Sequence, residues 1–167
     1  GDASLNIPDF RSSERTFELL NQVAGRAGRS LKKGKVVIQG FNMDHYSITC
    51  ASNHDYITFY NKEMKIREEL KYPPFYNLTL IKIISEDYEL LLTESKKIST
   101  YLKRELKDTI ILGPTFSNMY KINKKFNMNI ILKYKNTKEI INQLNYVNKH
   151  YISNKISVEI DINPLKL

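Results

Sequence analysis

The chain has 167 residues, 41% of them apolar, which leaves room for one ordinary domain or two small ones with a packed core. One cysteine and three scattered histidines exclude an internal disulfide and a multi-cysteine zinc site, and the lack of a long apolar run or leader pattern favours a cytoplasmic protein without a membrane partner. The net charge of +8 is uneven, with fifteen Lys/Arg against nine Asp/Glu in residues 73–167; this favours a nucleic-acid partner, although an AT-rich genome would also enrich lysine.

The first elements are predicted to be helix, strand and helix. A helix begins near Ser12 or Ser13, either of which can cap it, and frays near Gly28. Residues 35–39 form an unalternating apolar strand, which is typical of a buried strand in a mostly parallel sheet. Residues 44–70 are helical, with a break near residues 52–53.

A hinge follows these elements, because Pro73 and Pro74 lack an N–H and restrict the residues before them. After the hinge, the order is strand 78–84, helix 87–106, strand 109–112, strand 120–134, helix 137–151 and strand 156–162. Gly113-Pro114 is expected to stop the second strand, and the third is expected to bend or to fold as a hairpin at Lys124-Lys125. This order predicts an α+β domain of the ferredoxin-like, split β-α-β kind.

A glutamine and two arginines stand out on the first helix. At about 100° per residue, Gln22, Arg26 and Arg29 fall within an arc of about 60°, and Gly25 and Gly28 keep the surface between them low. Two neighbouring guanidinium groups repel each other unless an anion joins them, and the terminal phosphate of a nucleotide is such an anion. Spacing alone leaves open the alternative of a solvated helix face.

A second candidate site interleaves lysines with aromatic rings. Lysines can bind phosphates while aromatic rings stack on unpaired bases, so this segment predicts contact with DNA. The alternative is an edge strand that lysines protect from aggregation. The candidate DNA-binding residues are Tyr120, Lys121, Lys124, Lys125, Phe126 and Lys133.

The run Gln22-Val23-Ala24-Gly25-Arg26-Ala27-Gly28-Arg29 resembles motif VI of superfamily 2 helicases. Its flanks narrow the resemblance to the PriA family of bacterial replication-restart (primosomal) helicases, with Asn163 as a departure where the family more often has Asp. The flanking blocks are Pro8-Asp9-Phe10, His54-Asp55-Tyr56, Tyr72-Pro73-Pro74-Phe75 and Asp161-Ile162-Asn163-Pro164.

The resemblance implies a mixed α/β and α+β chain. Residues 1–43 would end the second RecA-like helicase lobe, 44–72 would be a helical connector, and 73–167 would bind DNA and partners. Arg29 would be the arginine finger, Arg26 would reach the γ-phosphate, Gln22 would couple the site, and Gly25 and Gly28 would lie at the ATP.

The resemblance also implies a function for the whole protein. It would be an ATP-dependent 3′-to-5′ DNA helicase that recognises stalled or branched forks and starts primosome assembly. ATP and magnesium would serve the full-length enzyme, and the family's zinc site would lie outside this stretch. Expected partners are branched and single-stranded DNA, single-strand-binding protein and primosome loader proteins.

This stretch has no phosphate loop and no Asp-Glu metal motif, so it is expected to be inactive alone. The alternatives are a non-enzymatic module that binds nucleic acid or protein, and a fragment of another superfamily 2 helicase.

Overall fold

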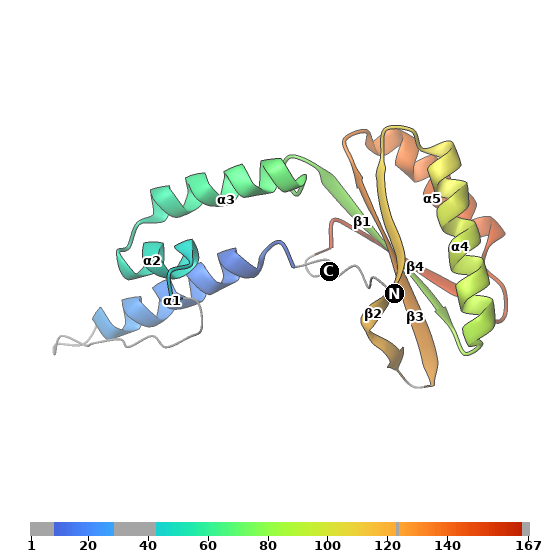
Figure 1. The fold of residues 1–167 in the computed structure, drawn as a ribbon, viewed down its shortest axis with the longest axis horizontal. Coiled ribbons are helices and arrows are strands. Elements are labelled where there is room, and N and C mark those ends of the chain that lie inside the picture. Colours follow the sequence, from blue (N-terminus) through green and yellow to red (C-terminus); the bar gives the residue numbers. More distant parts are fainter. Residues whose placement is uncertain (1–8, 29–42, 123, 165–167) are drawn as a thin grey trace. The chain divides into compact units, whose positions relative to one another are not determined.

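The structure is a computed structural model that describes residues 9–28, 43–122 and 124–164. The chain divides into two compact units, with the boundary between Leu70 and Lys71. The first unit, Asp9–Leu70, contains the motif-bearing helix, and the described part of the second begins at Lys71, one residue before the segment 72–75 that was predicted to be a hinge. Figure 1 shows the helices of the first unit, and the sheet with its helices in the second.

The first unit contains three helices, α1 (Ser12–Gly28), α2 (Tyr46–Ser52) and α3 (Tyr56–Leu70). The predicted start at Ser12, the end at Gly28 and the break between α2 and α3 are confirmed. Asp55 begins α3, because its carboxylate accepts a hydrogen bond from the Thr58 amide at 3.1 Å. The strand expected over 35–39 lies outside the described residues. The small core of this unit consists of Phe17, Cys50, Ala51 and Phe59.

The second unit has the predicted strand–helix–strand–strand–helix–strand order. Its elements are β1 (Asn77–Ser85), α4 (Tyr88–Glu105), β2 (Ile110–Ile122), β3 (Lys125–Tyr134), α5 (Thr137–His150) and β4 (Ser157–Ile162). The strands lie in the order β2-β3-β1-β4, and each neighbouring pair is antiparallel. The predicted split β-α-β order is therefore confirmed.

Helices α4 and α5 cover one face of this sheet (Figure 1). Side chains alternate along a strand, so Ile81 and Ile83 of β1 point to the helices together with Ile130 and Leu132 of β3. The helices contribute apolar residues at helical spacing, including Leu102, which is fully buried. One continuous apolar core thus lies between the sheet and its two helices.

The structure corrects the prediction for the second strand. Gly113-Pro114 does not stop it, because β2 continues to Ile122 with register shifts between Leu112 and Thr115 and between Phe116 and Lys121. Gly113 has a φ of +101°, and a Cβ at this position would lie 2.6 Å from the carbonyl oxygen of Asn129. Glycine readily adopts this positive φ, so Gly113 permits the bulge. Pro114 is tolerated because β2 is an outer strand of the described sheet. The segment at Lys124-Lys125 was predicted either to bend or to fold as a hairpin, and in the structure it lies at the turn of the β2–β3 hairpin.

Candidate functional site

The predicted nucleotide-facing residues lie on the C-terminal half of α1. Gln22 and Arg26 are exposed, and with Asn21 and Gly25 they line an open hollow of about 360 Å³. A Cβ at Gly25 would meet nothing within 4 Å, so the described residues leave open space above this glycine. The surface is therefore low at Gly25, beside Gln22 and Arg26. Gly28 is the last residue of α1, and Arg29 lies outside the described residues.

Arg26 lies in the last turn of α1. Within the described part of the chain, no carboxylate pairs with its guanidinium group. A guanidinium has five N–H donors in a fixed plane and is permanently charged, which suits it to a phosphate. Gln22 is one helical turn away on the same face and adds an amide. This face can therefore bind an anion that approaches over Gly25.

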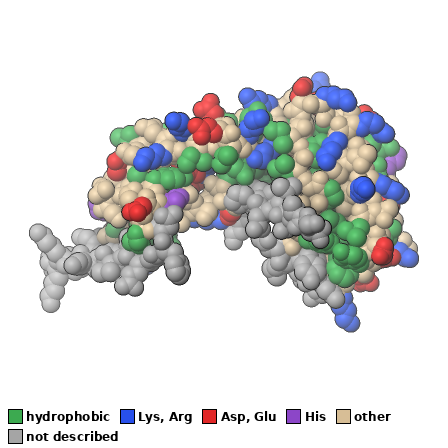
Figure 2. All heavy atoms as spheres, in the orientation of Figure 1, with side chains coloured by type: hydrophobic (Ala, Val, Ile, Leu, Met, Phe, Trp, Pro, Cys, Tyr) green, Lys and Arg blue, Asp and Glu red, His purple; other side chains and the backbone are tan. Residues whose placement is uncertain are grey.

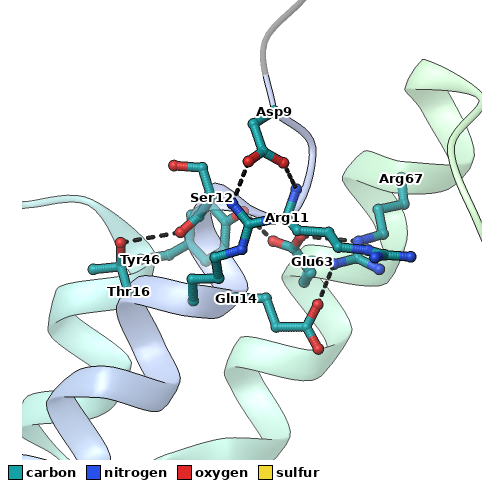
Figure 3. A network of polar contacts seen from close by, with 9 residues as sticks. Asp9, Arg11, Ser12, Glu14, Thr16, Tyr46, Glu63 and Arg67 are labelled. Carbon is teal, nitrogen blue, oxygen red and sulfur yellow. Dashed lines mark hydrogen bonds and ion pairs between the residues drawn. The ribbon is translucent and has the colours of Figure 1, made fainter. Parts of the chain in front are cut away.

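A polar cluster fixes the beginning of α1 (Figure 3). The Asp9 carboxylate accepts a hydrogen bond from the Arg11 amide at 3.1 Å and pairs with the Arg15 guanidinium. The Asp9 carbonyl accepts a hydrogen bond from the Ser12 amide at 3.1 Å. These bonds satisfy amides at a helix start, which the helix itself leaves without acceptors.

A buried ionic network joins α1 to α3 (Figure 3). The Arg67 guanidinium lies 2.7 Å from a Glu14 carboxylate oxygen and 3.0 Å from one of Glu63, and Arg67 and Glu63 are both buried. Although burial opposes it, hydrogen bonding to Glu14 and Glu63 raises the pKa of Arg67. The Tyr46 hydroxyl of α2 donates to Glu63, and burial followed by this hydrogen bond raises the pKa of Tyr46 to about 12. The network therefore holds the motif-bearing helix against the other two.

Sequence reasoning missed this network. The only local signal was the i, i+4 spacing of Glu63 and Arg67, which usually indicates an exposed pair on a helix surface. Glu14 is 53 positions from Arg67, so the sequence gave no indication that the two meet.

The predicted DNA-binding residues separate in the structure. Lys124 and Lys125 are exposed at the turn of the β2–β3 hairpin, where Lys124 has a φ of +65°. The Cα of Lys121 pairs with that of Phe126, but the side chains of Tyr120 and Lys121 lie outside the described part. Of the described members, Lys124 and Lys125 alone combine charge with exposure.

Phe126 and Lys133 lie on opposite faces of β3, because they are an odd number of positions apart. Phe126 packs against the core, with its ring 5.3 Å from that of Tyr88. Lys133 is only 7% exposed, and its ammonium group lies 3.8 Å from the centre of the Tyr72 ring. Burial, then repulsion from Lys71, lowers the pKa of Lys133. These two predicted residues are therefore engaged within their own unit and do not form one surface.

A ring pair that the sequence did not indicate lies beside this hairpin. Tyr88 of α4 and Phe116 of β2 are stacked, with 5.8 Å between centroids, and both are about two-fifths exposed. Phe116 lies in the bulged part of β2. Because the strand was predicted to end at residue 112, the sequence gave no indication that Phe116 belongs to the sheet.

The described residues contain no group of three or more His, Cys, Asp or Glu side chains placed to hold a metal ion. None of their helices is long and apolar enough to cross a membrane.

The family model and the curated relatives that match this chain point to the same protein family. Residues 68–165 match the family model described as the primosomal protein N C-terminal domain. The match begins three residues before the second unit.

Curated relatives extend the similarity into the first unit. The chain is 42% identical to the replication restart protein PriA of Bacillus subtilis (strain 168), covering 98% of this chain and 21% of the relative. It is 35% identical to PriA of Chlamydia pneumoniae, covering 99% of this chain and 22% of that protein. PriA of Treponema pallidum (strain Nichols) is 48% identical over 77 residues, covering 46% of this chain and 12% of the relative. The chain thus spans about a fifth of the length of the first two relatives.

Proposed function

Because this chain belongs to the primosomal protein N C-terminal domain family and is the C-terminal part of a PriA replication restart protein, we propose that the full-length protein is an ATP-dependent DNA helicase. It unwinds DNA in the 3′-to-5′ direction, recognises stalled or branched forks and starts primosome assembly. In this proposal, α1 ends a RecA-like lobe and faces the nucleotide, while the second unit binds DNA.

The observation that carries the proposal is the exposed face of α1. Gln22 and Arg26 lie together there beside an open Gly25, and Arg29 follows directly after the helix in the sequence. Charge develops on the phosphoryl group during transfer, and a fixed guanidinium stabilises it without reorganisation of solvent. Arg29 is the proposed arginine finger, Arg26 contacts the γ-phosphate region, and Gln22 couples the site to motion.

The fixed position of this face supports the same roles. The Glu14–Arg67–Glu63 network fixes the first turns of α1 against α3. The helix that carries Gln22 and Arg26 is therefore fixed in position within its unit. Positioned groups stabilise a transition state better than mobile ones, because they lose less freedom during the reaction. The first unit is therefore a suitable support for arginines that act on a nucleotide bound by another part of the protein.

ATP is the substrate in this proposal, and magnesium accompanies it in the full-length enzyme. Among the described residues, no three His, Cys, Asp or Glu side chains are grouped to hold a metal ion. The proposed partners are branched and single-stranded DNA, single-strand-binding protein and the primosome loader proteins. The exposed lysines of the second unit support the DNA part of the proposal.

Turnover and nucleotide binding of the full-length protein test this function together. Arg29→Ala is expected to lower DNA-stimulated ATP hydrolysis by roughly a thousandfold or more, with nucleotide affinity close to that of the wild type. Lys65→Ala, which removes an exposed charge of α3, is the matched control and is expected to leave turnover unchanged. Forked substrates with arms of either polarity give the direction of unwinding. Near-normal turnover of Arg29→Ala, or a wild-type protein without DNA-stimulated hydrolysis, would contradict the proposal.

A further inference from the structure

Aromatic rings of α4 and α5 form a column. The rings of Tyr101 and Tyr146 are stacked, with centroids 4.3 Å apart and planes 13° apart, and the ring of His150 follows at 4.0 Å. The Tyr101 hydroxyl donates a hydrogen bond to Gln143 at 2.6 Å, which fixes its ring between the two helices. Tyr146 is 39% exposed, so this ring is not needed to fill the core.

Beside this column is an open groove of about 460 Å³. Its lining includes Lys96, Lys97, Thr100, Tyr101, Arg104 and Tyr151. The three cations are exposed, and Figure 2 shows Lys and Arg side chains over the part of the molecule where α4 and α5 lie in Figure 1. The groove thus combines positive charge with ring surface on one face.

Two of these cations have carboxylate neighbours on the helix surface. The Lys97 ammonium lies 3.2 Å from Glu94 and the Arg104 guanidinium 3.0 Å from Glu105. Exposed pairs of this kind contribute little, because water screens them, so a phosphate can compete for the same cations. Lys97 and Arg104 are seven positions apart, or about 10.5 Å along the helix, which lets them bind separate phosphates of one strand.

We propose that this α4–α5 groove binds single-stranded nucleic acid. Phosphates contact Lys97 and Arg104, and an unpaired base lies against the ring of Tyr151. The Tyr101 ring is already stacked on Tyr146 and has the Arg104 guanidinium 5.4 Å from its centre, so it supports the groove wall. The proposal rests on the proposed DNA-binding function and assigns the contact to the helical side of the unit. Alternating cations and rings are the chemistry that such strands require.

The rings distinguish a nucleic acid from an acidic peptide. A peptide of acidic residues would use the cations of the groove but would gain nothing from an aromatic lining. A nucleic-acid strand uses both, because every base has a flat face that stacks on an aromatic ring. The hairpin predicted from the sequence lacks this combination in two of its members, since Phe126 packs on the core and Lys133 is buried.

Titration of the full-length protein with fluorescein-labelled oligo(dT) at several salt concentrations tests the groove. The double variant Lys97→Gln, Arg104→Gln is expected to bind more weakly, with the slope of log affinity against log salt reduced by about 1.4. Tyr151→Leu is expected to lower affinity about tenfold with an unchanged slope, and Tyr151→Phe is expected to bind like the wild type. Thermal melting of each variant verifies that the fold is retained.

The matched control is the double variant Lys103→Gln, Lys107→Gln, which removes two exposed charges outside the groove, one in the last turn of α4 and one two residues after the helix. If both double variants lose affinity equally, or neither does, the groove is not the site. If the groove variant keeps oligo(dT) binding but loses binding of poly-glutamate, the occupant is an acidic protein and the proposal is wrong. A wild-type protein that binds no oligo(dT) overturns both the groove and the proposed DNA function, whereas normal wild-type binding with unaffected variants overturns the groove alone.

Discussion

The two units of this chain are stabilised by different means. The second unit buries an apolar cluster of fourteen residues between its sheet and helices. Among the described residues of the first unit, the apolar cluster has four members, and the buried pair of Arg67 and Glu63 lies on α3 of the same unit. Exposed apolar side chains of the first unit include Leu19 and Ile57, which are 61% and 73% accessible. A small core contributes little stability, so the loss of one partner of the buried Arg67–Glu63 pair is expected to remove a large part of the stability of the first unit.

This contrast agrees with the extent of the family match. The matched segment, 68–165, contains nearly all of the unit that has a large core of its own. The helices of the first unit carry the candidate nucleotide-facing residues on a smaller core. Their position is therefore set by a few polar contacts, and those contacts are the most informative places for mutation.

Removal of Arg67 has the largest expected effect. Arg67→Ala leaves the buried Glu63 carboxylate without its guanidinium, so the free energy of unfolding of the first unit should fall by about 3–5 kcal/mol. Hydrogen–deuterium exchange, analysed separately for peptides from 9–70 and 77–162, measures the loss in each unit. Lys65→Ala is the control and should change stability by less than about 0.5 kcal/mol. Equal effects of the two variants would show that the network does not stabilise the unit.

In the second unit, removal of the Ser95 hydroxyl should stabilise the fold, whereas Arg67→Ala destabilises the first unit. Among the described residues, the buried Ser95 hydroxyl of α4 has no hydrogen-bond partner, and a buried unsatisfied group is costly. Ser95→Ala should therefore raise the free energy of unfolding by about 1 kcal/mol. Ser99 is equally buried on the same helix but donates to the Gly113 carbonyl at 3.3 Å, so Ser99→Ala should lower it by about 1 kcal/mol. Denaturant unfolding of the two variants compares them, and a loss of stability in Ser95→Ala would contradict the prediction.

The smallest expected effect is alkaline weakening of the first unit. The folded state raises the pKa of Tyr46 from 10.0 to about 12, so the contribution of its proton is complete below pH 10 and is lost as pH rises toward 12. Because much of this side chain remains in contact with water, the loss should be below about 1 kcal/mol. Tyr46→Phe should remove this part of the pH dependence. Urea unfolding of wild type and variant below pH 10 and near pH 12 measures the difference, and parallel pH profiles would show that Tyr46 does not contribute.

The sequence predicted elements better than it predicted sites. The ends of α1 were predictable because Ser12 and Gly28 act locally, and the sheet order followed from the alternation of strands and helices. The continuation of β2 was not, because it depends on Gly113 lying against Asn129 of the neighbouring strand. Local patterns are thus sufficient for helix ends and insufficient for bulges.

The candidate sites show the same limit. Gln22, Arg26 and Arg29 were predicted to share a face because helix geometry fixes their spacing. Gln22 and Arg26 line one hollow with Gly25, whereas Arg29 lies outside the described residues. That this face meets a nucleotide stays a prediction. The burial of Lys133 depends on Tyr72, which is far away in the sequence, so a run of lysines could not reveal it.

The bulged strand β2 also affects how this unit behaves at high concentration. β2 and β4 are the outer strands of the described sheet, and Pro114 in β2 has no N–H to donate. Two register shifts interrupt the regular ladder of the same strand, and β4 carries the acidic Glu159 and Asp161. A long and regular outer strand is a template on which other chains add by backbone hydrogen bonding. The irregular β2 and the charged, six-residue β4 are poor templates of this kind, so the sheet should resist edge-to-edge aggregation while the chain is crowded or newly made.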